Sequence, residues 1–583
     1  MPWSFLFIIL NIWSAVNAIS PLNFRSLPGW GAPSQPSTTE NYDFHEILDE
    51  NQDFHVHWNV DHEQKNITFE LHVRTHGYVG FGISHNGKMF PADIVIGWVK
   101  DEQIHFKDRH AVALEMPLVD SSQDWHLLYG AENTWGTVLK VTRLLDTCDP
   151  DDYTISDDTV HLLYAYHPDD PADDNNIPFH GSRRHGSKSI SLTTKMTPPE
   201  LPSDVQYIDW MNGKVLVPNK ETYYRCKTFT FDQLHKKHHL VRVEPRIQKG
   251  HENLIHHIIV YKCADVDRKF LGIEYECYMQ PNTQLYPCSA IMFGWEFSGN
   301  MDYPEHAGLP IAEPDDDAIY IMETHYNNPE LVGDIVDDSG IRIYYTPTLR
   351  QYDAGVLMTG IPISPLQVVP PLESHFTTTG FCHRDCLNQE LQNRLNSTPI
   401  RIFAVWQHSH KMAFRLRTRH FRNGVELEPL ADDANYDWNY QGFRYLKNNT
   451  TMEAGDEFVY TCHYNSMKKR TAVFGGPSTT DEMCFSLIFY YPRIGVESCQ
   501  ATPLFDGSNT TRGFINELNP QYPWGSEEAR AKFKKSLVNS KYRAHCHGEK
   551  RSPKWEYVEL EIPKPTVPYI PPQSDCPEAG DGR

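Results

Sequence analysis

The sequence has little of what marks several large classes of protein. Lysine and arginine number 53 against 76 acidic residues, and the formal net charge of -23 argues against nucleic acid or an anionic membrane surface as the main partner. No two cysteines have the Cys-x-x-Cys spacing of a zinc site, and the His-Glu-x-x-His helix motif of zinc hydrolases is absent from the sequence. Beyond the N-terminus, no stretch approaches the about 20 apolar residues of a membrane helix. Amphipathic helix patterns are scarce, and the clearest is SEEARAKFKKSLVN at 526–539.

The composition is that of a folded, multidomain chain. A length of 583 residues predicts roughly three or four domains. The N-terminal stretch has an apolar core from Trp3 to Trp13, followed by Val16 and Ala18 at the small-residue spacing of a cleavage site. We expect residues 1–18 to be a signal peptide. An uncleaved anchor is the alternative, because the stretch lacks a basic start, and it is the one expected route to membrane association.

The cysteines and glycosylation motifs indicate an oxidising compartment. The chain has 12 cysteines, an even number without zinc spacing, which favours disulfides. Asn-x-Ser/Thr motifs agree with passage through the lumen of the endoplasmic reticulum. These motifs place candidate glycans at Asn66, Asn396, Asn448, Asn449 and Asn509. The expected location is the lumen of the secretory pathway, in the endoplasmic reticulum or granules, or outside the cell.

Short alternating runs dominate the rest of the chain and predict an all-β protein. Runs such as FHVHWNV and ITFELHVRT are typical of an antiparallel β-sandwich. An acidic, then basic stretch with almost no apolar residues is typical of a linker, and Pro370 and Pro371 mark a plausible boundary between two further sandwiches. The predicted division is a first domain at 41–157, a linker at 168–200, two domains at 201–365 and 366–560, and a Pro-rich tail at 561–583.

Two histidines lie in the strand-like stretch IFAVWQHSHKMAF at 402–414. Because a strand alternates its faces, His408 and His410 are expected to project together from one side of a sheet. Two imidazoles held in this way are natural metal ligands. In a chain with 30 histidines, chance pairs are also expected, so spacing alone leaves a structural role open.

A second group is the adjacent pair His256 and His257 in ENLIHHIIVYKC, and a third candidate is His325 in IYIMETHYNNP, which taken singly is more often a hydrogen-bonded histidine than a ligand. Neighbours in an ideal strand face opposite sides, so both adjacent histidines bind one metal only if the strand bulges there. One core and one surface histidine is the alternative. Met483, just before a buried strand, is usually core filling, but a thioether ligand would select copper over zinc.

Further histidines are expected to be structural or solvent-facing, although spacing does not separate them from the groups above. They are His55 and His57, His235, His238 and His239, and His545 and His547.

Four motifs in order, LIHHIIVYKC, METHYNNP, WQHSHKM and DEMCFSLIFYYP, resemble the copper type II, ascorbate-dependent monooxygenases. This family includes dopamine β-hydroxylase and the peptidylglycine α-hydroxylating enzymes. GYVGFGIS followed by ADIVIGW resembles the DOMON domain that precedes the catalytic core in the dopamine β-hydroxylase branch. The resemblance covers about 41 to 560. It implies an N-terminal DOMON β-sandwich followed by two jelly-roll-like copper-binding β-sandwich domains.

The resemblance also implies a function and its residues. His256, His257 and His325 would bind one copper, and His408, His410 and Met483 a second, giving two coppers per chain. Ascorbate would supply electrons, and O2 and a small-molecule substrate with an activated C–H bond would react at the second copper. The family's catalytic tyrosine corresponds to Tyr224, next to Tyr223, with His408 as its catalytic companion. A catalytically silent, secreted DOMON and copper-binding protein is the alternative.

The family's disulfide pattern would use all twelve cysteines, leaving none for a disulfide-linked oligomer. The implied pairs are Cys148–Cys576, Cys226–Cys277, Cys263–Cys288, Cys382–Cys499, Cys386–Cys546 and Cys462–Cys484. Dopamine β-hydroxylase has an acidic residue where this chain has Met358 and Thr359, which predicts a pocket that is less selective for amines.

Overall fold

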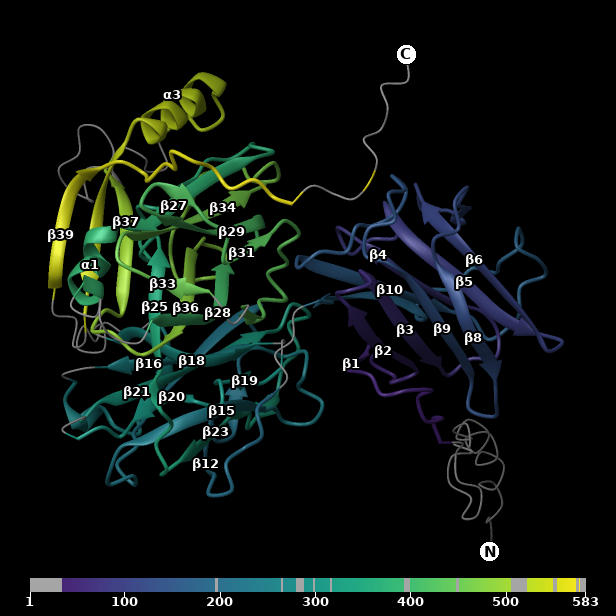
Figure 1. Ribbon diagram of the computed structural model, residues 1–583, viewed down its shortest axis with the longest axis horizontal. Coiled ribbons are helices and arrows are strands. Elements are labelled where there is room, and N and C mark those ends of the chain that lie inside the picture. Colours follow the sequence, from purple (N-terminus) through teal and green to yellow (C-terminus); the bar gives the residue numbers. More distant parts are fainter. Residues whose placement is uncertain are drawn as a thin grey trace, which may run out of the picture.

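The computed structural model describes residues 34–193, 198–263, 266–278, 288–296, 299–314, 317–392, 399–446, 450–504, 522–548, 553–572 and 576. Three β-sandwiches account for most of them, and the all-β prediction is confirmed. The first domain lies to one side of the second and third, which are stacked on each other (Figure 1). Among the described residues, no helix is long and apolar enough to cross a membrane.

The first domain packs a five-stranded sheet on a six-stranded sheet. In spatial order the five strands are β1 (Phe44–Ile47), β2 (Phe54–Asp61), β3 (Asn66–Val73), β9 (Thr137–Leu144) and β8 (His126–Glu132). The six are β11 (His185–Ser191), β10 (Thr159–Tyr166), β4 (Val79–Ser84), β5 (Ala92–Lys100), β6 (Gln103–Ala111) and β7 (Leu118–Val119). Phe54, Val56 and Trp58 of β2 point into the core, as the alternation in the sequence predicts.

The structure extends this domain beyond the predicted limit at 157. Strand β10 pairs with β4, and β11 pairs with β10. Residues 185–191, which were assigned to the linker 168–200, are therefore an edge strand of the first domain. Their polar sequence, HGSKSIS, does not show the apolar alternation of a strand, because an edge strand with one solvent-exposed face needs few apolar residues.

The second domain also has two main sheets. One contains β12 (Gln206–Met211), β23 (Gly340–Thr346), β15 (His238–Arg246), β20 (Ala307–Ile311) and β24 (Tyr352–Asp353), with β19 (Met301–Asp302) beside β15. The other contains β17 (Glu274–Glu276), β14 (Thr222–Phe229), β21 (Ile319–Asn327), β16 (Ile255–Cys263) and β18 (Cys288–Glu296). A 3-10 turn, η1 (Arg268–Phe270), and the pair β13 (Val215–Val217) and β22 (Ile335–Asp337) complete the described part.

The third domain has an eight-stranded and a five-stranded sheet. The larger contains β32 (Arg444–Tyr445), β28 (Ile400–Ser409), β36 (Cys484–Tyr491), β25 (Gly355–Gly360), β37 (Ser498–Leu504), β38 (Lys541–His547) and β39 (Pro553–Leu560), with β33 (Thr451–Met452) on β28. The smaller contains β27 (Phe376–Cys382), β34 (Asp456–Tyr464), β29 (Ala413–Arg422) and β30 (Val425–Glu426), with β31 (Ala431–Asp433) on β29. The pair β26 (Val368–Val369) and β35 (Val473–Phe474) lies apart from both.

The boundary between the second and third domains lies earlier than the predicted 365/366. Strand β25 pairs with β36 and β37 of the third domain, whereas β24 pairs with β20 of the second. The change of domain therefore falls between Asp353 and Gly355. The Pro370–Pro371 pair lies inside the third domain, because β26, which directly precedes it, pairs with β35.

Among the described residues, the third domain has two helices, α1 (Arg384–Gln392) and α3 (Glu527–Val538). The sequence predicted α3 correctly. The Ser526 hydroxyl accepts a hydrogen bond from the Ala529 amide and caps its N-terminus, and Phe533 is buried beneath it.

Five disulfides agree with the pairing that the family resemblance implies: Cys148–Cys576, Cys226–Cys277, Cys382–Cys499, Cys386–Cys546 and Cys462–Cys484. Cys263 is also disulfide-bonded, and Cys288 is its partner in strand register, although the Cys288 side chain lies outside the described residues. No cysteine among the described residues is free. This cysteine use fits the secretory pathway or secretion. The predicted signal peptide and the sequons at Asn396, Asn448, Asn449 and Asn509 lie outside the described residues; Asn66 begins β3.

Candidate metal centre

A buried histidine triad forms where β16 and β21 pair. The pairing contains a bulge between Ile255 and His257, so the predicted irregularity is present at His256. Nδ1 of His256 lies 3.1 Å from Nδ1 of His257. The ring of His325 lies 4.8 Å, centre to centre, from each of the other two. The three rings are mutually inclined by 49° to 74°, and one nitrogen from each lies within 4.8 Å of the others.

The surroundings of His325 fit a metal ion. Its side chain is fully buried, and neither ring nitrogen has a hydrogen-bond partner. An unsatisfied buried polar group costs about 1–3 kcal/mol, which coordination would offset. Burial and the neighbouring imidazoles hold the pKa of His325 well below its usual value, so the ring is neutral, the form that binds metals.

Of the two adjacent tyrosines, Tyr224 faces the triad. It lies opposite His325 in strand register, and the two rings stack at 4.3 Å with an angle of 12°. Tyr223 points to the other face of β14 and packs on Tyr326 in the core. Burial, and then the nearby Glu323, raise the pKa of Tyr224 well above its usual value, which keeps its hydroxyl protonated.

The second group lies at the end of β28. His408 and His410 project from the same face, as the strand period predicts, with ring centres 5.2 Å apart at 84°. Ser409 is opposite Cys484 in the register of β28 and β36, so Met483 follows as the neighbour of His410. The Met483 carbonyl accepts hydrogen bonds from the Ser409 and Tyr464 hydroxyls at 2.7 and 3.0 Å, and its side chain is buried.

The two groups come from different domains and face each other. The ring centres of His257 and His408 are 6.4 Å apart. One hydrophobic cluster extends through both domains and includes Ile258 and Met483. The Trp406 indole of the third domain donates a hydrogen bond to buried Glu296 of the second at 3.1 Å. The second and third domains therefore build one site at their interface.

Residues 433–444 of the third domain contact both groups, and no sequence motif indicates this. The Trp438 ring stacks on His256 at 4.4 Å, and its carbonyl accepts a hydrogen bond from His256 Nε2 at 3.1 Å. Gln441 donates to the same carbonyl at 2.8 Å, and its Oε1 accepts from His408 Nδ1 at 2.6 Å. These contacts leave His256 Nδ1 and His408 Nε2 as the nitrogens available to a metal.

Three of the histidines that were expected to be structural or solvent-facing, His239, His545 and His547, are placed differently. His239 accepts from the Arg350 amide through Nδ1 and donates to Asp353 through Nε2, so both nitrogens have protein partners. The rings of His545 and His547 are stacked at 6.3 Å with an angle of 8°. Neither arrangement aims several nitrogens at one point.

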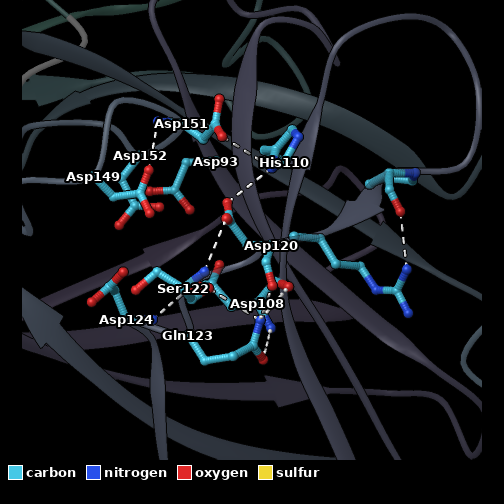
Figure 2. A network of polar contacts seen from close by, with 12 residues as sticks. Asp93, Asp108, His110, Asp120, Ser122, Gln123, Asp124, Asp149, Asp151 and Asp152 are labelled. Atoms are coloured by element: carbon cyan, nitrogen blue, oxygen red, sulfur yellow. Dashed lines mark hydrogen bonds and ion pairs between the residues drawn. The ribbon is translucent and has the colours of Figure 1, made fainter. Parts of the chain in front are cut away.

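The first domain contains a network of acidic side chains that the sequence analysis missed (Figure 2). Asp108 accepts hydrogen bonds from the amides of Asp124 and Trp125, while its other oxygen is buried without a partner. His110 donates to Asp120 at 2.9 Å. Burial raises the pKa of Asp108 to about 7. The residues of this network come from separate strands and loops, so no local sequence motif identifies them.

Sequence models of three domain families match the chain. They are the DOMON domain at 50–167, and the N-terminal and C-terminal domains of copper type II ascorbate-dependent monooxygenases at 208–333 and 352–504. DBH-like monooxygenase protein 1 of Gallus gallus is 40% identical over 75% of this chain and 71% of its own length. DBH-like monooxygenase protein 2 of Mus musculus is 34% identical over 78% and 73%, and dopamine beta-hydroxylase of Canis lupus familiaris is 34% identical over 78% and 72%.

Proposed function

Since this chain belongs to the copper type II ascorbate-dependent monooxygenases, we propose that it is an active member, which uses two coppers, ascorbate and O2 to hydroxylate an activated C–H bond of a small, phenylethylamine-like substrate. The observation that carries the proposal is that His257 and His408, from different domains, face each other at 6.4 Å. Each stands in a group of three candidate ligands. A degenerate relative would more often have lost one of the six.

The donor sets suit copper. His256, His257 and His325 form an all-imidazole set, which suits a metal that passes electrons. His408 and His410 with Met483 form a mixed set, in which the thioether favours Cu(I). Copper supplies the electron transfer and the activation of O2, and the protein supplies position and potential. The Trp438 carbonyl and the Gln441 amide hold one imidazole in each set in a defined tautomer.

Tyr224 and His408 are the proposed catalytic pair. Tyr224 stacks on His325 and stays protonated, so it can donate a hydrogen bond toward the space between the two groups. His408 would ligate copper through Nε2, because Gln441 accepts a hydrogen bond from its other nitrogen. The six candidate ligands are buried, His408 with only 4% exposure, and Met483 belongs to the hydrophobic cluster that both domains share.

The substrate pocket is proposed to be less selective for amines than that of dopamine β-hydroxylase. Met358 and Thr359 of β25 occupy the stretch where that enzyme has an acidic residue. Met358 is buried in the same cluster as Met483, and the Thr359 hydroxyl is buried without a partner. A neutral lining offers no counter-charge to an ammonium group. Turnover of a panel of phenylethylamines and their neutral analogues tests this; a clear preference for dopamine contradicts it.

Copper stoichiometry together with ascorbate-dependent oxygen uptake tests the function. The full chain is expected to bind two coppers, and Met483→Leu, which removes only the thioether, is expected to lose oxygen uptake. Met412→Leu is the matched control, because Met412 is also buried but packs in a different cluster. If two coppers bind but the Met483 substitution leaves oxygen uptake unchanged, that uptake does not depend on this centre. Such a result would instead favour a catalytically silent copper-binding protein.

A further inference from the structure

The segment 433–444 lies between the DOMON domain and the two histidine groups. It begins at the end of β31 and ends at the start of β32, so its two ends are tied to different sheets of the third domain. Between these ends it touches β10 and β11 of the DOMON domain on one side and His256 and His408 on the other. The segment therefore connects that domain directly with the candidate metal centre.

The first anchor to the DOMON domain is buried. Asp433 accepts hydrogen bonds from the Thr159 amide and hydroxyl at 2.9 and 2.7 Å. Arg444 donates to the same carboxylate and to the Thr159 hydroxyl, at 2.7 and 3.0 Å. Both ends of the segment are thus held at one point of β10. The Asp433 and Thr159 side chains are almost fully buried, which makes these charge-assisted bonds stronger than surface contacts.

A second anchor fixes the middle of the segment. The Ser189 hydroxyl of β11 donates to Asp437 at 2.6 Å, and the Ser191 amide donates to the Tyr440 hydroxyl at 3.1 Å. Asp437 and Tyr440 flank Trp438 in sequence. The residues that contact the DOMON domain thus alternate with those that contact the histidines.

The inner face of the segment reaches both histidine groups at once. Trp438 stacks on His256 and accepts its Nε2–H, and Gln441 accepts the Nδ1–H of His408. Gln441 also donates to the Trp438 carbonyl, so the two acceptors are linked to each other. The Lys411 ammonium lies over the Trp438 ring, 4.7 Å from its centre. A shift of the segment would move both acceptors together.

We propose that the DOMON domain is a positioning element of the metal centre: through Thr159 and Ser189 it holds the segment 433–444, whose Trp438 and Gln441 orient one imidazole in each histidine group. The consequence for turnover rests on the proposed function, whereas the consequence for copper binding does not. Partners that orient metal-binding histidines typically change metal affinity or activity by about 10–100-fold when removed. Here those partners are themselves held by another domain.

The test removes the two anchoring hydroxyls and leaves the segment intact. Thr159→Ala/Ser189→Ala in the full chain is expected to lower the apparent copper affinity about 10-fold and to change the Cu(II) electron paramagnetic resonance spectrum. Thr68→Ala/Thr142→Ala is the matched control. These two hydroxyls hydrogen-bond to each other at 3.1 Å on β3 and β9 of the same domain, in the sheet that does not hold the segment.

An unchanged affinity and spectrum in the Thr159/Ser189 variant, or an equal change in the Thr68/Thr142 variant, overturns the proposal. Far-ultraviolet circular dichroism of both variants checks folding. If the double variant does not fold, Ser189→Ala alone decides through the same spectrum, because the Thr159–Asp433 contact remains. If the native chain binds copper without taking up oxygen, the proposed function fails while the affinity and spectrum still decide the positioning role.

Discussion

Imidazole rings gather on the outer face of the DOMON sheet as well as at the triad of His256, His257 and His325, but in a different arrangement. Strands β1 and β2 bring His45 beside His57, with ring centres 4.3 Å apart and planes inclined by only 18°. In the triad the ring centres are 4.8–5.2 Å apart, and the planes are inclined by 49° to 74°. Ring spacing is therefore similar, and the nearest DOMON pair is stacked, although His57 and His72 are inclined by 62° at 5.2 Å.

Orientation and hydrogen bonding together distinguish the two groups. The lone pair of an imidazole nitrogen lies in the plane of the ring, so inclined rings can direct several lone pairs at one point, whereas His45 and His57 are stacked face to face. His57 and His72 are inclined, but His72 Nε2 donates a hydrogen bond to Glu70 at 2.7 Å. His45 instead hydrogen-bonds His55 at 3.2 Å, and His55 donates to the Gln52 carbonyl at 3.0 Å. We conclude that a cluster of neighbouring imidazoles, present in both regions, does not by itself identify a metal site.

The largest expected effect comes from removing one ring from each region. His325→Ala should reduce copper from two to one per chain and lower ascorbate-dependent oxygen uptake by at least about 100-fold, because a ligand is lost. His57→Ala should leave both quantities unchanged. Metal analysis and oxygen-electrode measurements on the two variants check this, and loss of copper in the His57 variant would break the comparison.

A smaller effect is expected from the tyrosine that covers the triad. Tyr224→Phe keeps the ring stacked on His325 but removes the hydroxyl, so oxygen uptake should fall at least about 10-fold while two coppers remain bound. Tyr223→Phe is the control, since its ring packs in the core on Tyr326. Equal rates for the two variants would show that the Tyr224 hydroxyl takes no part in the reaction.

The smallest expected effect is a pH response of the DOMON histidines. Burial, and then the neighbouring His45 and His72, lower the pKa of His57 to about 4, with Glu70 opposing them and His55 adding to them. Between pH 6.5 and 4 the unfolded chain binds a proton here that the folded chain does not, so stability falls as the pH falls through this range.

We expect acidification from pH 7 to pH 5 to destabilise this sheet by about 1–2 kcal/mol, and His57→Gln to remove much of that loss. Hydrogen exchange of the β2 amides in the full chain, at both pH values, measures it. A loss of protection that is the same with and without His57 would assign the pH response to another group.

Much of the candidate site was predictable because its signals are local. The period of a strand places His408 and His410 on one face, and the apolar alternation identifies most strands of the three sandwiches. The requirement for a bulge at His256 also follows from strand geometry, and the structure has one. Local patterns failed at β11, where a polar edge strand resembles a linker, and at the change of domain after Asp353, which depends on which strands β25 pairs with.

The sequence by itself determined the types and order of the six candidate ligands, the all-β class and the helix α3, because each depends on residues that are close in the chain. Only the tertiary structure decided that Tyr224 rather than Tyr223 faces His325, and that Trp438 and Gln441 hold the two histidine groups. It also decided that His256 and His257, and His325 far from them in the sequence, bring one nitrogen each within 4.8 Å of the others. Ring orientation and contacts between domains depend on packing among residues far apart in sequence, which no local period encodes.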